Sequence, residues 1–207
     1  MAELEIRRRS ALEGRLEPGD FGTVCADGPR LMVRERPALA IAQVEAWPES
    51  AAETVEKIGK TVGVRPSRDP LVATVAGETT ALWVGPDSWL LVEPESARGV
   101  ASLVETLAAE LGGQAALTDQ GHGRVCLRIS GPALTDVLAK GCTLDLDPGR
   151  DFDPGRVVGT SLGHMTVTMH RVDEETADLY VARSFAVSFL DWLMHAAAEY
   201  GVRVEAA

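Results

Sequence analysis

Residues 80–92 read TALWVGPDSWLLV, and this stretch decides the fold. Two apolar runs, 80–84 and 89–92, flank the tetrapeptide GPDS at 85–88. Proline favours the second position of such a four-residue turn, and aliphatic, β-branched and aromatic runs on either side favour strands. The pattern therefore predicts a β-hairpin with antiparallel strands.

Helices are predicted on both sides of this hairpin. Over 51–62, apolar residues recur at the helical period, and Gly63 provides a stop signal. A second apolar stripe follows a cap at Ser96 and is stopped by glycines at 112–113. Strands predicted over 31–44 and 71–75 complete this first part of the chain.

The second part of the chain repeats this order of elements. A strand begins at Val125, and the Gly-Pro pair at 131–132 opens a helix. Residues 164–170 alternate between apolar and polar side chains, which predicts a half-buried strand. The last predicted strand covers 179–183, and aromatic and aliphatic residues at helical spacing predict that a helix over 185–200 ends the fold.

These elements define an α+β fold rather than a doubly wound parallel sheet, because adjacent strands recur without a helix between them. We expect two βαββα halves, about 31–113 and 114–202, with largely antiparallel sheets covered by amphipathic helices. Both halves belong to a single domain, 31–207. Residues 1–30, with several Gly and Pro and no sustained periodicity, are expected to form an N-terminal arm or an irregular lead-in.

The composition indicates a folded and acidic protein, with 45% hydrophobic residues, 25% charged residues and a net charge of -11. Because nucleic-acid binding relies on clustered Lys and Arg, we expect no nucleic-acid partner. No stretch approaches the ~20 apolar residues that cross a bilayer, and the N-terminus lacks the apolar run of a secretory signal. We therefore expect a soluble, cytoplasmic protein that does not contact a membrane.

The three cysteines, Cys25, Cys126 and Cys142, lie far apart and form no C-x-x-C motif. Neither a disulfide framework nor a zinc site is indicated by this spacing. We expect them to be buried, reduced thiols.

No constellation in the sequence predicts catalysis. His164 and His170 share one face of a predicted strand, but six extended residues place them roughly 20 Å apart, too far to share a metal ion. We interpret both as outward-facing polar residues. Residues 121–124, GHGR, match neither glycine-rich phosphate motif and are typical of a turn. Asp191 and His195 are one helical turn apart, as in a surface pair. We therefore predict no catalytic residue and no metal ligand, and assign no cofactor-binding residue.

Arg183-Ser184-Phe185 stands at a predicted junction between a strand and a helix. A serine before an apolar-periodic helix is an ordinary N-cap, and this interpretation is the simpler one. The alternative is that the arginine and the aromatic ring contact another protein. With His164 and His170, these three residues are our candidates for a partner interface.

Several segments of the sequence occur in the same order in one known family. They are WVGPDSWL (83–90), DQGHGR (119–124), ISGP (129–132), LAKGC (138–142) with LDL (144–146), and RSF (183–185) before WL (192–193). On these segments the chain resembles the sarcosine oxidase gamma subunit family, over about residues 30 to 202.

The resemblance implies a fold related to the folate-binding domain of glycine-cleavage aminomethyltransferases. It also implies a non-catalytic gamma subunit that assembles with alpha, beta and delta subunits. Such a complex oxidises sarcosine to glycine and passes the one-carbon unit to tetrahydrofolate. Its FAD, FMN, NAD, tetrahydrofolate and zinc are expected in the other subunits, with no cofactor bound by this chain alone. Two alternatives remain open: a stand-alone folate-binding or aminomethyltransferase-like protein, and a gamma subunit of an oxidase or dehydrogenase for another N-methyl amino acid.

Overall fold

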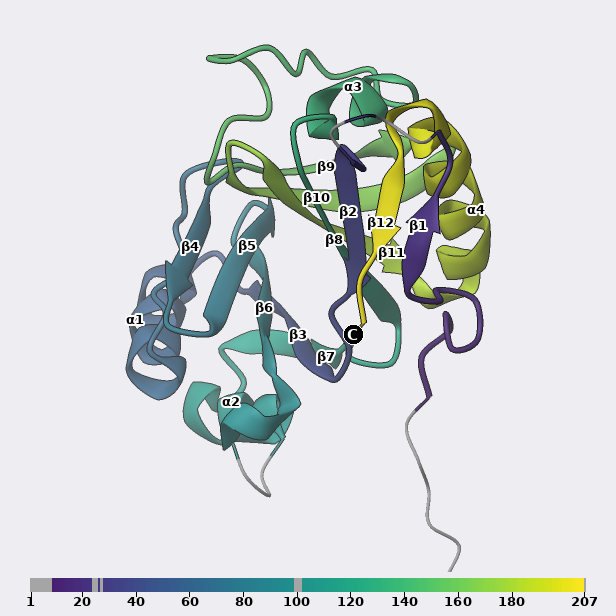
Figure 1. Ribbon diagram of the computed structural model, residues 1–207. Helices are drawn as coiled ribbons and strands as arrows, with labels where there is room; N and C mark the ends of the chain where they lie inside the picture. The colour runs from purple at the N-terminus through teal and green to yellow at the C-terminus, as the bar shows by residue number, and fades with distance from the viewer. Residues whose placement is uncertain (1–8, 24–25, 27, 99–101, 207) are drawn as a thin grey trace, which may run out of the picture.

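Two β-sheets pack face to face, and helices cover the outer face of each, so the molecule has four layers (Figure 1). The computed structural model describes residues 9–23, 26, 28–98 and 102–206. Three clusters of buried apolar residues fill the spaces between the layers. The predicted α+β class with largely antiparallel sheets is confirmed.

The smaller sheet has five strands, all antiparallel to their neighbours. In spatial order they are β4 (Ala73–Ala76), β5 (Thr79–Gly85), β6 (Ser88–Pro94), β3 (Leu39–Ala46) and β7 (Ala115–Asp119). Its outer face is covered by α1 (Ala51–Val62) and α2 (Leu103–Leu111), and the short 3-10 helix η1 (Glu95–Arg98) follows β6. The predicted hairpin is β5–β6, in which Trp83 lies opposite Trp89 and Asp87 takes a positive φ of 50° at the turn.

The larger sheet has seven strands. In spatial order they are β1 (Gly19–Phe21), β12 (Val202–Val204), β2 (Leu31–Glu35), β8 (Arg124–Ser130), β11 (Thr176–Ala182), β10 (Met165–Asp173) and β9 (Val157–Leu162). Its outer face is covered by α3 (Leu134–Ala139) and α4 (Ala186–Ala197), with the 3-10 turns η2 (Arg183–Phe185) and η3 (Ala198–Tyr200) at the two ends of α4. The pair β12–β2 is parallel, and the other neighbours are antiparallel.

Each sheet is built from one run of the same elements. The first run is β3-α1-β4-β5-β6-α2-β7 and the second is β8-α3-β9-β10-β11-α4-β12, with corresponding strands in the same spatial order. The differences are β1 and β2, which come before the first run in the chain but join the larger sheet: β2 inserts between β8 and β12, and β1 adds an edge strand beside β12. The boundary between the two halves that the sequence suggests, at 113/114, falls before β7. Strand β7 nevertheless completes the five-stranded sheet of the first run.

The prediction that a helix ends the fold is wrong, because β12 follows α4 and pairs with β1 and β2. The predicted strand over 31–44 is two strands, β2 and β3, which enter different sheets. Ser96 does not cap α2; Ser102 does, in a capping box with Glu105. In the expected lead-in, Leu12 is only 1% exposed and packs into the core, and β1 adds an edge strand.

Two glycines shape a slot for the indole ring of Trp192 on α4. A Cβ on Gly163 would lie 2.5 Å from Trp192 Cδ2, and a Cβ on Gly141 would overlap the same ring. Gly163 also has a φ of 58° in the tight turn between β9 and β10. The side chain of Trp192 thereby holds this turn and the end of α3 against α4.

We predict that Gly163→Ala lowers the free energy of unfolding by about 3 kcal/mol, since the methyl group overpacks the indole and the backbone conformation disfavours a side chain. Urea unfolding followed by circular dichroism measures the loss. Gly159→Ala on the neighbouring strand β9 is the control, because a Cβ there meets nothing within 4 Å. Equal losses for the two variants would show that the slot does not constrain residue 163.

Candidate functional site

An ion network ties the seven-stranded sheet to the segment in which the chain crosses from β2 to β3. Asp178 on β11 is 0% exposed, and its carboxylate accepts hydrogen bonds from two arginines. Arg128 on β8 donates from Nε and Nη2 at 2.7 and 2.8 Å. Arg36, in the crossover, donates from Nη1 at 2.6 Å. The hydrogen bond to Asp178 raises the pKa of Arg128, so this guanidinium keeps its positive charge.

His170 lies beside this network and is only 4% exposed. The prediction that it faces solvent is wrong, because the two sheets pack face to face and bury this side of β10. Burial lowers the pKa of His170 to about 4, against the opposing attraction of Asp178. His164, in contrast, is exposed in the β9–β10 turn, with a φ of 69°. The structure does not place the two histidines on a common surface.

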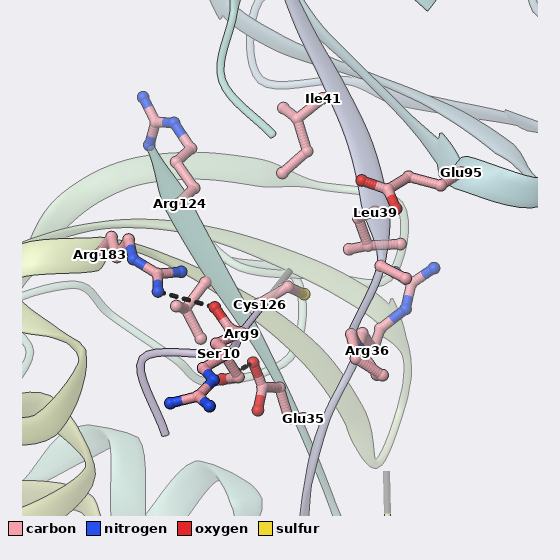
Figure 2. A pocket seen from close by; sticks show the side chains of 13 residues that line it. Arg9, Ser10, Glu35, Arg36, Leu39, Ile41, Glu95, Arg124, Cys126 and Arg183 are labelled. Carbon is pink, nitrogen blue, oxygen red and sulfur yellow. Dashed lines mark hydrogen bonds between the residues drawn. The ribbon is translucent and has the colours of Figure 1, made fainter. Parts of the chain in front are cut away.

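A cavity of about 160 Å³ lies next to the network (Figure 2). It opens where the β2–β3 crossover passes the starts of β8 and η2. Its walls combine charged and apolar side chains, and they are formed by Arg9, Ser10, Glu35, Arg36, Pro37, Ala38, Leu39, Ile41, Glu95, Arg124, Val125, Cys126 and Arg183.

Two segments that are far apart in the sequence meet in this cavity. The backbone N–H of Arg183 donates to the carbonyl of Gly123 at 2.9 Å, and Arg124 pairs with Ala182 across β8 and β11. Arg183 also donates from Nη2 to the carbonyl of Arg9 at 2.7 Å. The predicted junction residue Arg183 therefore lines the cavity together with Arg124, which sequence reasoning did not single out.

The other two junction residues do not line this cavity. Ser184 is exposed inside η2, and the N-cap position of α4 is Phe185, which makes no side-chain cap, so the capping interpretation of Ser184 is wrong. Phe185 is 51% exposed, which is unusual for a large apolar ring.

Arg124 lies in the cavity wall and forms no ion pair with another residue that the structure describes. Its Nε is buried and has no hydrogen-bond partner among the described residues, and burial lowers the pKa of the guanidinium. One sequence pattern could have pointed to Arg124, namely the alternation of strand β8. Val125, Leu127 and Ile129 pack under the helices, so Arg124 falls on the opposite face of the strand. Such a group can bind an anion but cannot act as a nucleophile.

The remaining sequence expectations concern cysteines, metals and membranes. Cys126 is buried, and burial raises the pKa of its thiol; Cys142 is half-buried, and Cys25 lies outside the described residues. Across the described ranges, no group of three or more His, Cys, Asp or Glu side chains is placed to hold a metal ion. Among the described helices, none is long and apolar enough to cross a membrane.

The fold defines the class of protein first. The chain superposes on the glycine cleavage system aminomethyltransferase T from Bartonella henselae with a TM-score of 0.60 and 13% identity, over 87% of this chain and 48% of that chain. It is therefore an α+β chain with an aminomethyltransferase-like fold, as the sequence predicted.

The family follows from closer matches. Residues 46–199 match the model of the family described as Sarcosine oxidase, gamma subunit family, and the chain belongs to this family. It is 36% identical to a sarcosine oxidase subunit gamma from Corynebacterium sp. (strain P-1), over 62% of this chain and 63% of that protein, a little under two thirds of the relative's own length. A relative from Arthrobacter sp is 32% identical, over 76% of this chain and 75% of its own length.

A solved structure supports the same family. It is the heterotetrameric sarcosine oxidase from Corynebacterium sp. U-96, in complex with pyrrole 2-carboxylate. One of its chains matches with a TM-score of 0.78 and 28% identity, over 93% of this chain and 96% of that chain.

We predict that Asp178→Asn lowers the free energy of unfolding by about 3 kcal/mol, because it leaves two half-buried guanidinium groups without their counter-charge. Chemical denaturation measures the effect. Asp20→Asn is the matched control, since Asp20 forms a similar two-bonded pair with Arg203 on the surface and its loss should be small. Equal effects at the two sites would contradict the structural role of the buried network.

We also predict that stability falls as the pH is lowered from about 6.5 to about 4. In this window the unfolded chain binds a proton at His170 and the folded chain does not, so the free energy of unfolding drops by up to about 3 kcal/mol. His170→Gln should remove this part of the pH dependence, and His164→Gln, at an exposed site, should leave it. Identical pH profiles for the two variants would refute the assignment.

Proposed function

We propose that this chain is the non-catalytic gamma subunit of a heterotetrameric sarcosine oxidase. The observation that carries the proposal is the near-complete overlap with one chain of such a complex, over 93% of this chain at a TM-score of 0.78. Its partners are the alpha, beta and delta subunits, and the complex works in the cytoplasm.

In this assignment the complex oxidises the N-methyl group of sarcosine, releases glycine and transfers the one-carbon unit to tetrahydrofolate. FAD, FMN, NAD, tetrahydrofolate and zinc are held by the other subunits. This chain contributes two sheets that share a buried apolar cluster, with the crossover between them bound to Asp178, which suits a structural subunit. Substrate choice belongs to the subunit that holds the flavin at which the substrate reacts.

The partner surface that we propose is centred on Phe185. Its ring is 51% exposed at the start of α4, with the exposed hydroxyl of Ser184 beside it in sequence. Aromatic side chains of this kind are enriched at the centres of protein interfaces. His164 is exposed and remains a candidate contact, whereas the burial of His170 removes it from the surface.

The test of this function is affinity purification of the tagged full chain from its native cytoplasm. Flavin absorbance and sarcosine-dependent hydrogen peroxide formation are then measured on the recovered material. We expect flavin-bearing partners and peroxide formation with sarcosine. Peroxide formation with another N-methyl amino acid instead would keep the subunit role and change the substrate.

A stand-alone folate-binding protein is the second candidate, because the fold matches an aminomethyltransferase over 87% of this chain. It predicts that the pure full chain binds tetrahydrofolate directly. Calorimetry with tetrahydrofolate decides between the two: binding by a solitary, folded chain favours this candidate, and absence of binding leaves the subunit role.

We predict that Phe185→Ser weakens assembly at least about tenfold while leaving the unfolding temperature of the chain unchanged, because the ring buries apolar surface only in the complex. Surface plasmon resonance against the other subunits measures the affinity. Val75→Ser provides the control, since Val75 is 61% exposed on β4. If Val75→Ser weakened the affinity for the other subunits and Phe185→Ser did not, the interface would lie on the five-stranded sheet instead.

A further inference from the structure

The cavity beside the β2–β3 crossover carries more positive than negative charge in a protein whose net charge is -11. Four arginines line it, against two glutamates. Gathering guanidinium groups in one small cavity is unfavourable unless an anion is bound or the charges are already paired. An arginine of this cavity that has no acidic partner is therefore available to bind an anion.

Ion pairs within the protein neutralise only part of the positive charge in the cavity. Arg36 is bound to Asp178, which neutralises it. The carboxylate of Glu35 accepts a hydrogen bond from the hydroxyl of Ser10. Arg183 donates to a neutral backbone carbonyl, that of Arg9, so its charge is not cancelled. Arg124 has a buried Nε without a partner among the described residues.

Arg124 and Arg183 come from neighbouring strand ends, because the backbone N–H of Arg183 bonds to the carbonyl of Gly123. Figure 2 shows both arginines on one side of the cavity, with Leu39 and Ile41 across from them. One side of the cavity thus carries two guanidinium groups, and the other side offers apolar surface at Leu39 and Ile41, with the charged side chains of Arg36 and Glu95 next to Leu39. A ligand that suits both walls has a charged head with a short apolar tail.

We propose that this cavity binds a small aliphatic monocarboxylate, with its carboxylate on Arg124 and Arg183 and its alkyl part against Leu39 and Ile41. A volume of about 160 Å³ is close to that of a cavity that holds one benzene molecule, so the ligand has a handful of non-hydrogen atoms. Nucleotides, flavins and folates are far too large for it.

The chain itself supplies the wall nearest the N-terminus. Residues 9 and 10 are fixed there by the Arg183–Arg9 and Ser10–Glu35 hydrogen bonds. Because this wall and the two arginines belong to this chain, the proposed ligand contacts require no residue of another subunit. This favours a free carboxylate over an acidic side chain inserted by a partner, and the proposal does not rest on the subunit assignment.

The experiment uses the full chain, both alone and in any complex with which it is purified, and sodium propionate as the probe. Saturation-transfer NMR detects binding, and calorimetry gives the dissociation constant. Propionamide, a neutral isostere, is the matched ligand control. We expect propionate to bind and propionamide to bind at least about tenfold more weakly, because a charge-assisted bidentate contact is lost.

Arg124→Gln should weaken propionate binding by about tenfold or more. Arg150→Gln is the protein control, since Arg150 is an exposed residue in the loop between α3 and β9. Leu39→Phe tests the apolar wall without changing charge, and it should weaken longer carboxylates more than acetate. Circular dichroism establishes that each variant is folded.

Equal binding of propionate and propionamide, or unchanged affinity in Arg124→Gln, would overturn the proposal. Binding by the chain alone that disappears in the assembled complex would assign the cavity to a partner's acidic side chain and would also overturn it. Failure of the chain to recruit flavin-bearing partners would leave the propionate result untouched, so the two proposals can fail separately.

Discussion

The carboxylate of Asp178 is the group on which the rest of this structure depends. It lies at the interface between the two sheets and is hydrogen bonded to Arg128 on β8 and Arg36 in the crossover. A buried carboxylate is tolerated only when its charge and lone pairs are satisfied. Satisfying it fixes where the chain leaves β2, and therefore where β3 and the five-stranded sheet begin. The cavity exists because the crossover is held at this point.

Local patterns predicted much of the fold. The β5–β6 hairpin and α1 follow from turn chemistry and from a clean helical period that ends at Gly63. Short strands were missed where they are edges or lack a clear alternation, as in β1, β7 and β12. The insertion of β2 between β8 and β12 is a long-range pairing, and no local signal encodes such a partner.

The candidate site was predicted only in part, for a similar reason. Arg183 was singled out because it stands at a strand end, and the structure places it in the cavity wall. Arg124 was set aside as part of a glycine-rich turn, because its significance depends on a neighbour that is far away in sequence. His170 was interpreted as exposed because alternation marks two faces of a strand but cannot show that both faces are covered. The family resemblance includes the segments that carry Arg124 and Arg183, but it does not say what these side chains do.

The position of β2 has a consequence for the order in which the protein is made. Residues 39–119 contain every strand of the five-stranded sheet, so that sheet can close while the ribosome is still adding the second run. Strand β2 emerges earlier, yet its neighbours are β8 and the last strand, β12. Its edge toward β8 can be covered once residue 130 is made, but its edge toward β12 stays open until residues 202–204 are made, and an open strand edge invites pairing with other chains. The nascent chain is therefore exposed to aggregation through this edge of β2 until β12 has emerged and paired with it.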